Sequence, residues 1–419
     1  MLGSGESRGD SEAIQSFGIT MDRFDLTIIG GGIVGMATAM TLKERHPTLR
    51  VCVTEAEGRV AAHQSGHNSG VLHSGIYYKP GSDKAKLCRS GKEMMEAFCD
   101  EHQVLWDRCG KVVVATNQSE LERLDRIQDR ARANGVIHER IDEQQLKEIE
   151  PASAGIAALH VPETGIVNYR CVCEKMAERF RDLGGVLQLD FRVSKIESAG
   201  HSLLLTNPAG TSVSSGGLIN CAGLFSDRIC RLAGGTSDLK VLPFRGEYYE
   251  LAPGSESLCR NLIYPVPDPS FPFLGVHFTR MIDGGVECGP NAVFALSRTG
   301  YRWSDVSPSD ILEAVAFSGF RRLAGKHWRM GIEEMHRSLS KQAFVRALQH
   351  LIPSIRSEHL IPGRSGVRAQ AVTPDGKLYD DFLIVPSDRA IHVLNAPSPA
   401  ATSSLAIASQ VADAYEALS

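Results

Sequence analysis

The sequence predicts an α/β protein of two domains that begins with a Rossmann-like unit, and three observations support this. Residues 24–55 run from an apolar strand through a glycine-rich turn and a small-residue helix to a second strand. Stretches at 110–116 and 258–267 read as strands, and a helical pattern returns near the C-terminus. A chain of 419 residues, 42% of them hydrophobic, exceeds what one core usually organises.

The turn after the first strand has the glycine pattern of a dinucleotide site. Gly30 permits a tight turn, Gly32 lets the backbone approach a pyrophosphate, and Gly35 lets the next helix pack on the sheet. Glu55 follows Gly35 by 20 residues, where a carboxylate accepts from a ribose hydroxyl. An adenine dinucleotide is therefore predicted, and the alternative is a structural turn. The predicted contacts are Gly30, Gly32, Ile33, Val34, Gly35, Glu55 and Ala56.

A later strand that ends in small residues favours FAD over NAD. In GGLINCAGLFSDRI, residues 216–229, the apolar part leads into Ala222 and Gly223 and then into a helix. Small residues at a strand end let the chain pass close to a cofactor. Any other strand-to-helix turn would share this pattern, which is the alternative.

The stretch VAAHQSGHNSGVLHSGIYYKPGSDKAKLC, residues 60–88, reads as neither helix nor strand. It is rich in histidine, glycine and serine and contains two adjacent tyrosines. Either it is a flexible surface loop, or its small residues lie against a large ligand.

Several longer strings along the chain carry a resemblance to a known family. They are HNSGVLHSGIYYKPGSDKAKLC, PETGIVNYR, INCAGLFSDRI, PFRGEYYEL, IYPVPDPSFPFLGVHFT, GPNAV, GVRAQ and NAPSPAATSS. From Phe24 to the C-terminus the chain resembles the L-2-hydroxyglutarate oxidase and dehydrogenase family, within the FAD-dependent D-amino-acid oxidase and glycine oxidase group. The resemblance implies oxidation of L-2-hydroxyglutarate to 2-oxoglutarate by hydride transfer to flavin.

The resemblance also implies the domain organisation. It predicts a Rossmann-like FAD-binding domain interleaved with an antiparallel-sheet substrate domain, after a disordered tail. The expected bounds are 1–21 for the tail, 22–92, 160–240 and 362–419 for the FAD domain, and 93–159 and 241–361 for the substrate domain.

Further cofactor contacts follow from the resemblance. It lays the HNSG loop against the flavin ring, with the loop's amides and hydroxyls at the ring's polar edge. Pro399 is expected in the first turn of the C-terminal helix, whose free N–H groups would face the flavin; an ordinary capped helix is the alternative. His67 either bonds covalently to the flavin, as in some relatives, or only hydrogen-bonds, which we favour. The predicted contacts are Gln64, His67, Asn68, Ser69, Gly70, Val193, Ala222, Gly223, Ser398, Ala400, Ala401 and Thr402.

The substrate site implied by the resemblance needs a cation and a base. Arg368 in GVRAQ matches the carboxylate-binding arginine of glycine oxidase relatives, and a guanidinium suits a carboxylate because its planar fork binds bidentately. His277 is the expected base and His73 its competitor, although either histidine could be structural. Secondary candidates for the distal carboxylate or the pocket wall are Tyr77, Tyr264, Lys79 and Arg245.

The net charge and the cysteine content restrict which partners the sequence predicts. The net charge of −4, with both signs mixed along the chain, gives no footprint for nucleic acid. Ten dilute cysteines without zinc-like spacing predict reduced thiols and no metal site, so we expect a cytoplasmic protein. Met21 is an alternative start. The acceptor is expected to be quinone or oxygen.

The basic segment 318–330 raises the question of a membrane. With its aromatic residues it could lie on the inner face of a membrane where quinone is collected, or it could be a solvated face.

The nearest rival function is an amine oxidase of the glycine or sarcosine type. A non-catalytic flavin-binding protein and an NAD-dependent dehydrogenase are weaker alternatives.

Overall fold

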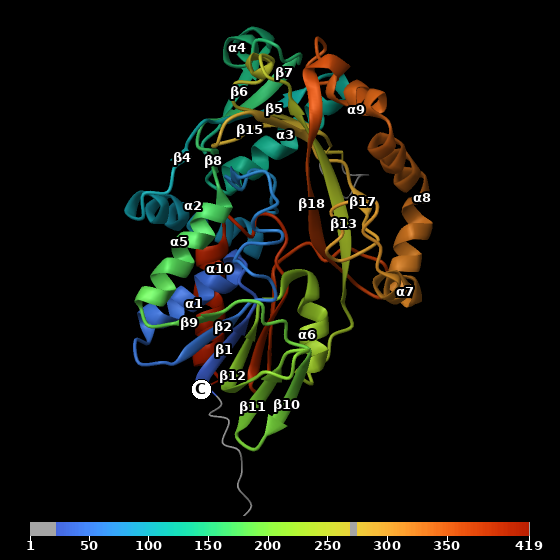
Figure 1. Cartoon of the computed structure of the whole chain (residues 1–419). Helices are drawn as coiled ribbons and strands as arrows, with labels where there is room; N and C mark the ends of the chain where they lie inside the picture. The colour runs from blue at the N-terminus through green and yellow to red at the C-terminus, as the bar shows by residue number, and fades with distance from the viewer. Residues whose placement is uncertain (1–21, 269–274, 419) are drawn as a thin grey trace, which may run out of the picture.

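The computed structural model describes residues 22–268 and 275–418, which build two large sheets set one above the other (Figure 1). The predicted tail, 1–21, and the alternative start at Met21 lie outside the described residues.

The lower sheet in Figure 1 contains the predicted Rossmann-like unit. Its order is β10-β11-β12-β1-β2-β9, with β20 beside β12 and β19 beside β20. The pairs β12–β1, β1–β2, β2–β9 and β12–β20 are parallel. The bounds are β1 (Arg23–Ile29), β2 (Val51–Thr54), β9 (Val186–Gln188), β10 (Lys195–Ala199), β11 (Ser202–Thr206), β12 (Ser212–Asn220), β19 (Leu383–Ser387) and β20 (Ala390–Asn395).

Helices cover both faces of this sheet, as parallel strands require. One face packs Leu26 and Ile28 against α1, α5 and α10, and the other packs Leu218 against Ile229 of α6. Figure 1 shows the C-terminal α10 side by side with α1, so the first and last helices share one core. The bounds are α1 (Ile33–Arg45), α2 (Asp83–Glu101), α5 (Tyr169–Asp182), α6 (Ser226–Leu232) and α10 (Ser404–Glu416).

The carboxyl ends of the parallel strands meet at one edge of the sheet. β1 ends at Ile29, β2 at Thr54 and β12 at Asn220, so the turns that follow them lie together. Ligands of open α/β sheets bind in the crevice outside such an edge. This edge faces the second sheet.

The second sheet is mostly antiparallel and has the order β17-β13-β16-β15-β14-β5-β7-β6, with β18 beside β13. The β14–β5 pair is parallel. α3, α4 and α9 pack against this sheet, and α7 and α8 run along its outer side (Figure 1). The bounds are β5 (Lys111–Ala115), β6 (Glu139–Asp142), β7 (Ala157–Val161), β13 (Lys240–Leu251), β14 (Leu262–Pro265), β15 (His277–Arg280), β16 (Val286–Gly289), β17 (Val293–Phe294), β18 (Leu360–Val372), α3 (Gln118–Ala133), α4 (Glu143–Ile149), α7 (Pro308–Ala316), α8 (Ser318–Leu339) and α9 (Lys341–Leu348).

The chain passes back and forth between the two sheets, and one segment differs from the expected division. The expected FAD-domain segment 362–419 begins inside β18, yet β18 pairs with β13 along its length in the second sheet. A small third sheet of β3 (Val71–Leu72), β8 (Gly165–Val167) and β4 (Trp106–Asp107) is not paired with either large sheet, but its apolar residues pack in the cores of both.

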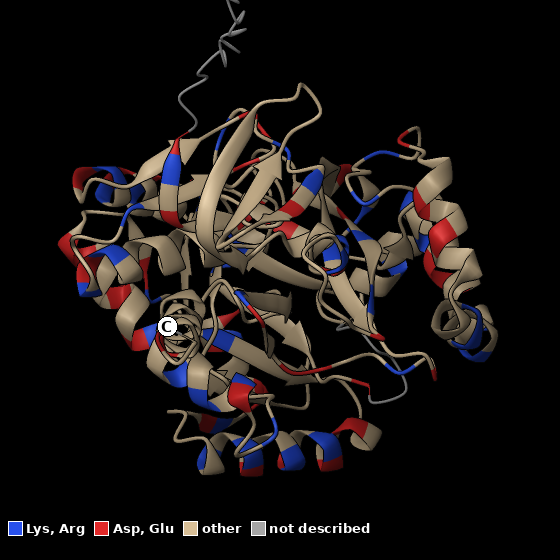
Figure 2. Ribbon diagram, turned by 90° about the horizontal axis from the view of Figure 1, so that it is seen from below, with Lys and Arg blue, Asp and Glu red and all other residues tan. Residues whose placement is uncertain are grey.

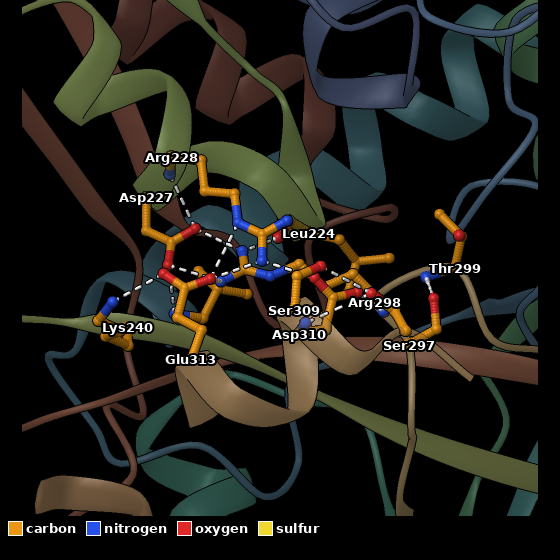
Figure 3. Close-up of polar contacts among 12 residues, drawn as sticks. Leu224, Asp227, Arg228, Lys240, Ser297, Arg298, Thr299, Ser309, Asp310 and Glu313 are labelled. Atoms are coloured by element: carbon orange, nitrogen blue, oxygen red, sulfur yellow. Dashed lines mark hydrogen bonds and ion pairs between the residues drawn. The ribbon is translucent and has the colours of Figure 1, made fainter. Parts of the chain in front are cut away.

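A buried network of ion pairs joins α6 to α7 and to the segment before α7 that carries Arg298 (Figure 3). Asp227 of α6 pairs with Arg298, and their side chains are 3% and 4% exposed. Arg228 Nη2 lies 2.6 Å from Asp310 Oδ1, and Lys240 Nζ lies 2.7 Å from an oxygen of Glu313. Removing one partner of such a buried pair leaves the other charge uncompensated. The network therefore holds α7 and Arg298 against α6.

The surface carries charged side chains of both signs, and the cysteines are unpaired. Figure 2 shows Lys and Arg interspersed with Asp and Glu along the helices seen from below. All ten cysteines are free thiols. In the part of the chain that the structure describes, no helix has both the length and the apolar character needed to cross a membrane.

Candidate active site

A cavity of about 1440 Å³ lies between the carboxyl edge of the first sheet and one face of the second. Its wall includes Gly30 and Ala222 from the first sheet and His277 and Arg368 from the second. The volume exceeds the 300 to 1,000 Å³ or so that is usual for one drug-sized ligand. It therefore has room for a dinucleotide together with a small substrate.

The glycine turn has the geometry of a phosphate cradle. Gly30 has φ +112°, and a Cβ there would lie 2.4 Å from the carbonyl oxygen of Cys221. A Cβ on Gly35 would lie 2.0 Å from Gly30 O, so this glycine serves helix packing, as predicted, and does not line the cavity. Gly32 is the N-cap residue of α1 and supplies no side-chain cap. Ser65 Oγ binds the N–H of Ile33, so an anion would bind at the other N–H groups of the first turn.

Glu55 is tied to the turn more closely than the sequence predicts. Its Oε2 accepts from Gly31 N at 2.6 Å and its Oε1 from Glu57 N at 2.9 Å. Burial raises its pKa, while these two backbone hydrogen bonds act in the opposite direction. The carboxylate still lines the cavity, so it can shape the turn and face a ribose.

The HNSG loop lines the cavity, and Asn68 uses most of its amide inside the loop. Its Nδ2 donates to Gln64 O and Ser65 O, and its Oδ1 accepts from Gly70 N. The amide therefore holds the loop together through both of its N–H groups, while its Oδ1 can still accept a second hydrogen bond from a ligand. Gly70 has φ +69° and is absent from the cavity wall.

Two other loop residues connect the loop to β18. His67 Nδ1 lies 3.0 Å from Ser365 O, so Nδ1 carries the proton, and its ring lies 4.4 Å from that of Tyr301. Gln64 Oε1 accepts from Ala369 N at 2.8 Å. Gln64 thus fixes the backbone directly after Arg368.

The C-terminal segment reaches the cavity through turns rather than through a helix start. α10 begins at Ser404, and Ala400 N donates to Pro397 O at 2.9 Å. The prediction that Pro399 opens the helix is therefore wrong, because turns before Ser404 use the N–H of Ala400. Thr402 is fully buried, and its Oγ1 accepts from His73 N at 3.1 Å.

The other predicted cofactor contacts lie on the wall of the same cavity. These are Gly32, Ile33, Val34, Ala56, Ser69, Val193, Ala222, Gly223, Ser398, Ala400 and Ala401. Ser65, which the sequence analysis missed, also lines it, and its Oγ accepts from Ile33 N at 2.9 Å. The cradle, the helix start and the long wall fit FAD.

The alternation of side chains along the strands decides which residues of the second sheet line the opposite wall of the cavity. Side chains two residues apart share a face of a sheet, and the β14–β15 register sets Tyr264 across from His277, with rings 4.1 Å apart. Phe244 pairs with Arg368 across β13 and β18, and both line the cavity with Tyr248. One face of the second sheet thus presents aromatic, imidazole and guanidinium groups to the cradle.

Both candidate bases are neutral at ordinary pH. Burial, followed by the nearby charges of Arg368 and Lys111, lowers the pKa of His277 to about 4, although a hydrogen bond to Gly275 acts to raise it. His277 Nδ1 donates to Gly275 O at 2.9 Å, so Nε2 is the ring nitrogen that can accept a proton. Burial first, then Lys111, His277 and Arg368, lowers the pKa of His73 to about 3, and its Nε2 lies 3.4 Å from Ser398 Oγ.

Arg368 points into the cavity. The part of its surface that solvent can reach opens into this cavity, and protein surrounds the rest of the residue. Burial lowers the pKa of its guanidinium. Tyr248 lies close enough that Arg368 affects its pKa, which burial raises. Tyr248 was not predicted as a site residue, because no local signal in PFRGEYYEL separates the two faces of that strand.

Arg245 and Lys79 do not join this group. Arg245 alternates with Phe244 and Gly246, so it points to the opposite face of β13, where it pairs with Glu247 at 3.0 Å and lies over the Trp303 ring. The prediction of Arg245 as a substrate ligand is therefore wrong. Lys79 is exposed and lines the cavity with Arg126 and Arg130, at its rim. Tyr77 lines the wall, but its Oη is buried and has no hydrogen-bond partner among the described residues.

A cradle of this kind, facing a wall of neutral imidazoles and a guanidinium, defines a flavin-dependent oxidoreductase. The chain belongs to the FAD dependent oxidoreductase family, whose model matches residues 25–414. The predicted fold class, cofactor and enzyme class are confirmed by this match.

Relatives with high identity span nearly the whole chain. L-2-hydroxyglutarate dehydrogenase of Indibacter alkaliphilus is 50% identical over 392 residues, covering 93% of this chain and 98% of that protein. The Escherichia coli K12 enzyme of that name is 45% identical, with 94% of each chain covered. The human mitochondrial one is 43% identical and covers 93% of this chain and 88% of its own. The resemblance found in the sequence is confirmed.

Solved structures support the fold. L-α-glycerophosphate oxidase from Mycoplasma pneumoniae with FAD bound superposes with a TM-score of 0.77 at 20% identity, over 94% of this chain and 95% of that chain. Glycine oxidase from Geobacillus kaustophilus gives 0.71 at 19% identity, over 95% and 96%. At these identities the likeness concerns the fold alone.

Proposed function

We propose that the protein oxidises L-2-hydroxyglutarate to 2-oxoglutarate. Relatives of 43% to 50% identity carry the name L-2-hydroxyglutarate dehydrogenase. The observation that carries the proposal is a buried neutral imidazole, His277, whose Nδ1 carries the proton so that Nε2 can accept one, close to the guanidinium of Arg368. A 2-hydroxy acid needs this pair: a cation for its carboxylate and a base for its hydroxyl.

Each residue has one task in the proposed reaction. Arg368 binds the carboxylate beside the reacting carbon, because a guanidinium stays charged and meets a carboxylate bidentately. His277 Nε2 takes the hydroxyl proton as the carbon–oxygen bond becomes a carbonyl. His73 is the alternative base. Bound FAD supplies the two-electron acceptor for the hydride that leaves the carbon.

Anaerobic reduction tests the proposal. The yellow holoenzyme is mixed under argon with L-2-hydroxyglutarate or with its D enantiomer, and the flavin absorbance is followed. Bleaching by the L form alone is the expected result. A flavin that stays oxidised with both enantiomers would refute the assignment.

Two other outcomes separate the rival functions. Bleaching by glycine or sarcosine, and not by the hydroxy acid, would identify an amine oxidase. Bound FAD that no small carboxylate or amine reduces would identify a flavin-binding protein without this catalytic role.

We also propose that a quinone held in a membrane reoxidises the enzyme, because α8 has an exposed apolar face. Trp328, Ile332, Met335 and Leu339 are 47% to 71% exposed, and their spacing puts them on one side of the helix. Arg321, Arg322, Lys326 and Arg329 lie on the same helix, which favours anionic lipid. Oxygen is the alternative acceptor.

Vesicle binding tests the membrane contact. The holoenzyme should sediment with phosphatidylglycerol vesicles and less with phosphatidylcholine vesicles, and Ile332→Ser should weaken this binding. Leu105→Ser is the matched control, because Leu105 is 69% exposed outside this helix. Equal binding of both variants would exclude the α8 face. Rapid oxygen consumption without added quinone would instead identify an oxidase.

A further inference from the structure

Lys111 is a buried lysine next to the substrate wall that the reaction above does not use. It begins β5 and is 1% exposed. Its Nζ lies 4.6 Å from the centroid of the Tyr77 ring and 5.1 Å from that of Tyr264. Both rings line the cavity, so the ammonium lies directly behind the aromatic wall.

The surroundings of Lys111 differ from those of the other buried lysines. Lys43 donates to two backbone carbonyls, Lys84 pairs with Asp380 at 2.7 Å, and Lys92 pairs with Glu96 at 2.6 Å. Within residues 22–268 and 275–418, no carboxylate forms an ion pair with Lys111; two aromatic rings are its neighbours. A buried cation without an anion is costly, and a bound anion would offset that cost.

Lys111 and Arg368 act on the same two imidazoles. Both cations lower the pKa of His277 and of His73, so both lie near the position proposed for the reacting hydroxyl. Glu287 lies on the same sheet face but pairs with Arg364, so it does not neutralise them. Besides the guanidinium of Arg368, the pocket therefore has the positive charge of Lys111, with which no carboxylate of the described residues forms an ion pair.

We propose that Lys111 supplies the second positive charge of the substrate pocket and makes it selective for dicarboxylic over monocarboxylic acids. The inference rests on the proposed function and adds the residue that recognises the carboxylate remote from the reacting carbon. Lys111 acts through the rings of Tyr77 and Tyr264 and not by direct contact, so it is a positioning residue. A low-dielectric wall lets its field reach the cavity with little screening.

The selectivity depends on pH in a defined direction. Burial lowers the pKa of Lys111 to about 7. The titratable groups that face it are Tyr77, Tyr264 and Cys88, whose pKa values burial raises, and His73 and His277, whose pKa values burial lowers. Between pH 6 and 8.5 Lys111 alone in this set changes its charge. The preference for a dianion should therefore weaken as pH rises.

The first experiment uses the wild-type holoenzyme and two acids without a hydroxyl, glutarate and butyrate. Neither can be oxidised, so their binding, read from the flavin absorbance, is independent of the proposed reaction. At pH 6 glutarate should bind about tenfold more tightly than butyrate, and at pH 8.5 the ratio should fall severalfold. The pH 6 ratio should survive 0.5 M salt, because a buried charge is screened less than the surface cations at the cavity rim.

The second experiment removes the charge. Lys111→Met should abolish the glutarate preference and raise KM for L-2-hydroxyglutarate about tenfold, with kcat within about twofold and FAD content unchanged. Lys341→Met is the matched control, because Lys341 also lies over a tyrosine, at 5.9 Å, but away from the cavity. It should keep the wild-type ratio.

Several results would overturn the inference. These are equal binding of glutarate and butyrate at pH 6, a ratio that does not change with pH, or a preference that persists in Lys111→Met. If that variant does not accumulate as folded protein, the wild-type pH series decides alone. A failure of L-2-hydroxyglutarate to bleach the flavin while glutarate is preferred would reject the proposed substrate and leave the dicarboxylate pocket standing.

Discussion

The neutral state of His277 leads to a prediction about low pH. An ordinary histidine has a pKa of 6.5, and burial lowers that of His277 to about 4. The difference corresponds to roughly 3 kcal/mol that favours the uncharged ring. At pH 5.5 about thirty sites should be neutral for each protonated one, whereas an ordinary histidine would be about nine-tenths charged. A base works only when neutral, so activity is lost as pH falls through the folded pKa.

Stopped-flow reduction of the flavin by L-2-hydroxyglutarate under argon measures this directly. The limiting rate should stay level from pH 7 to 5 and decline only below about pH 5. Carboxyl groups of the substrate titrate near pH 4 as well, so the level region is the informative part. A rate that halves near pH 6.5 would refute the reasoning about burial.

Matched variants identify the base. His277→Gln keeps a polar side chain and should lower the reduction rate about 10² to 10⁴-fold with FAD content unchanged. His73→Gln should lower it far less. The opposite ranking would transfer the role to His73, and equal small losses in both would exclude an imidazole base.

Further predictions concern binding, the cofactor and stability. Arg368→Met should retain FAD but weaken substrate binding by about 2 to 5 kcal/mol, measured from KM; unchanged affinity would remove it from the site. Gly30→Ala should yield protein without FAD because its φ of +112° and a close backbone contact exclude a side chain; Gly325→Ala, with nothing nearby, should stay yellow. Arg298→Met should lower the free energy of unfolding by about 3 to 5 kcal/mol in urea, and a loss below about 1 kcal/mol would show the network to be dispensable. Acid precipitation should leave the flavin in solution; yellow pellets would show attachment through His67.

The parts of the fold that sequence reasoning predicted are those encoded locally. The turn from Gly30 to Gly35 needs residues without a Cβ at fixed spacing, and Glu55 follows at the end of the next strand, so a short window specifies the whole unit. The start of α7 is encoded in the same local way, because Ser307 accepts from Asp310 N and Pro308 is the first residue of the helix.

The substrate wall could not be predicted in the same way, because strand register decides which face a residue occupies. Arg245 and Arg368 look alike as isolated cations, yet alternation turns the first away from the cavity. Lys111 stands in an ordinary strand string, and only the pairing of β5 with β14 brings it behind Tyr264. A one-residue shift in register would reverse these assignments.

The role of Asn68 shows another limit. A side chain in a ligand-facing loop can bind the ligand or hold the loop, and composition does not distinguish the two. Here both N–H groups of the amide and one lone pair of its oxygen form hydrogen bonds within the loop.

The contact between α1 and α10 has a consequence for synthesis of the protein. The wall of the cofactor cavity includes Ala400 to Thr402. The helix that follows the glycine turn, α1, packs against α10 in a shared core. A nascent chain therefore lacks part of its flavin site until residues 400–416 have been translated and have left the ribosome. Prematurely terminated products should bind FAD poorly, so they would not withdraw the cofactor from finished enzyme.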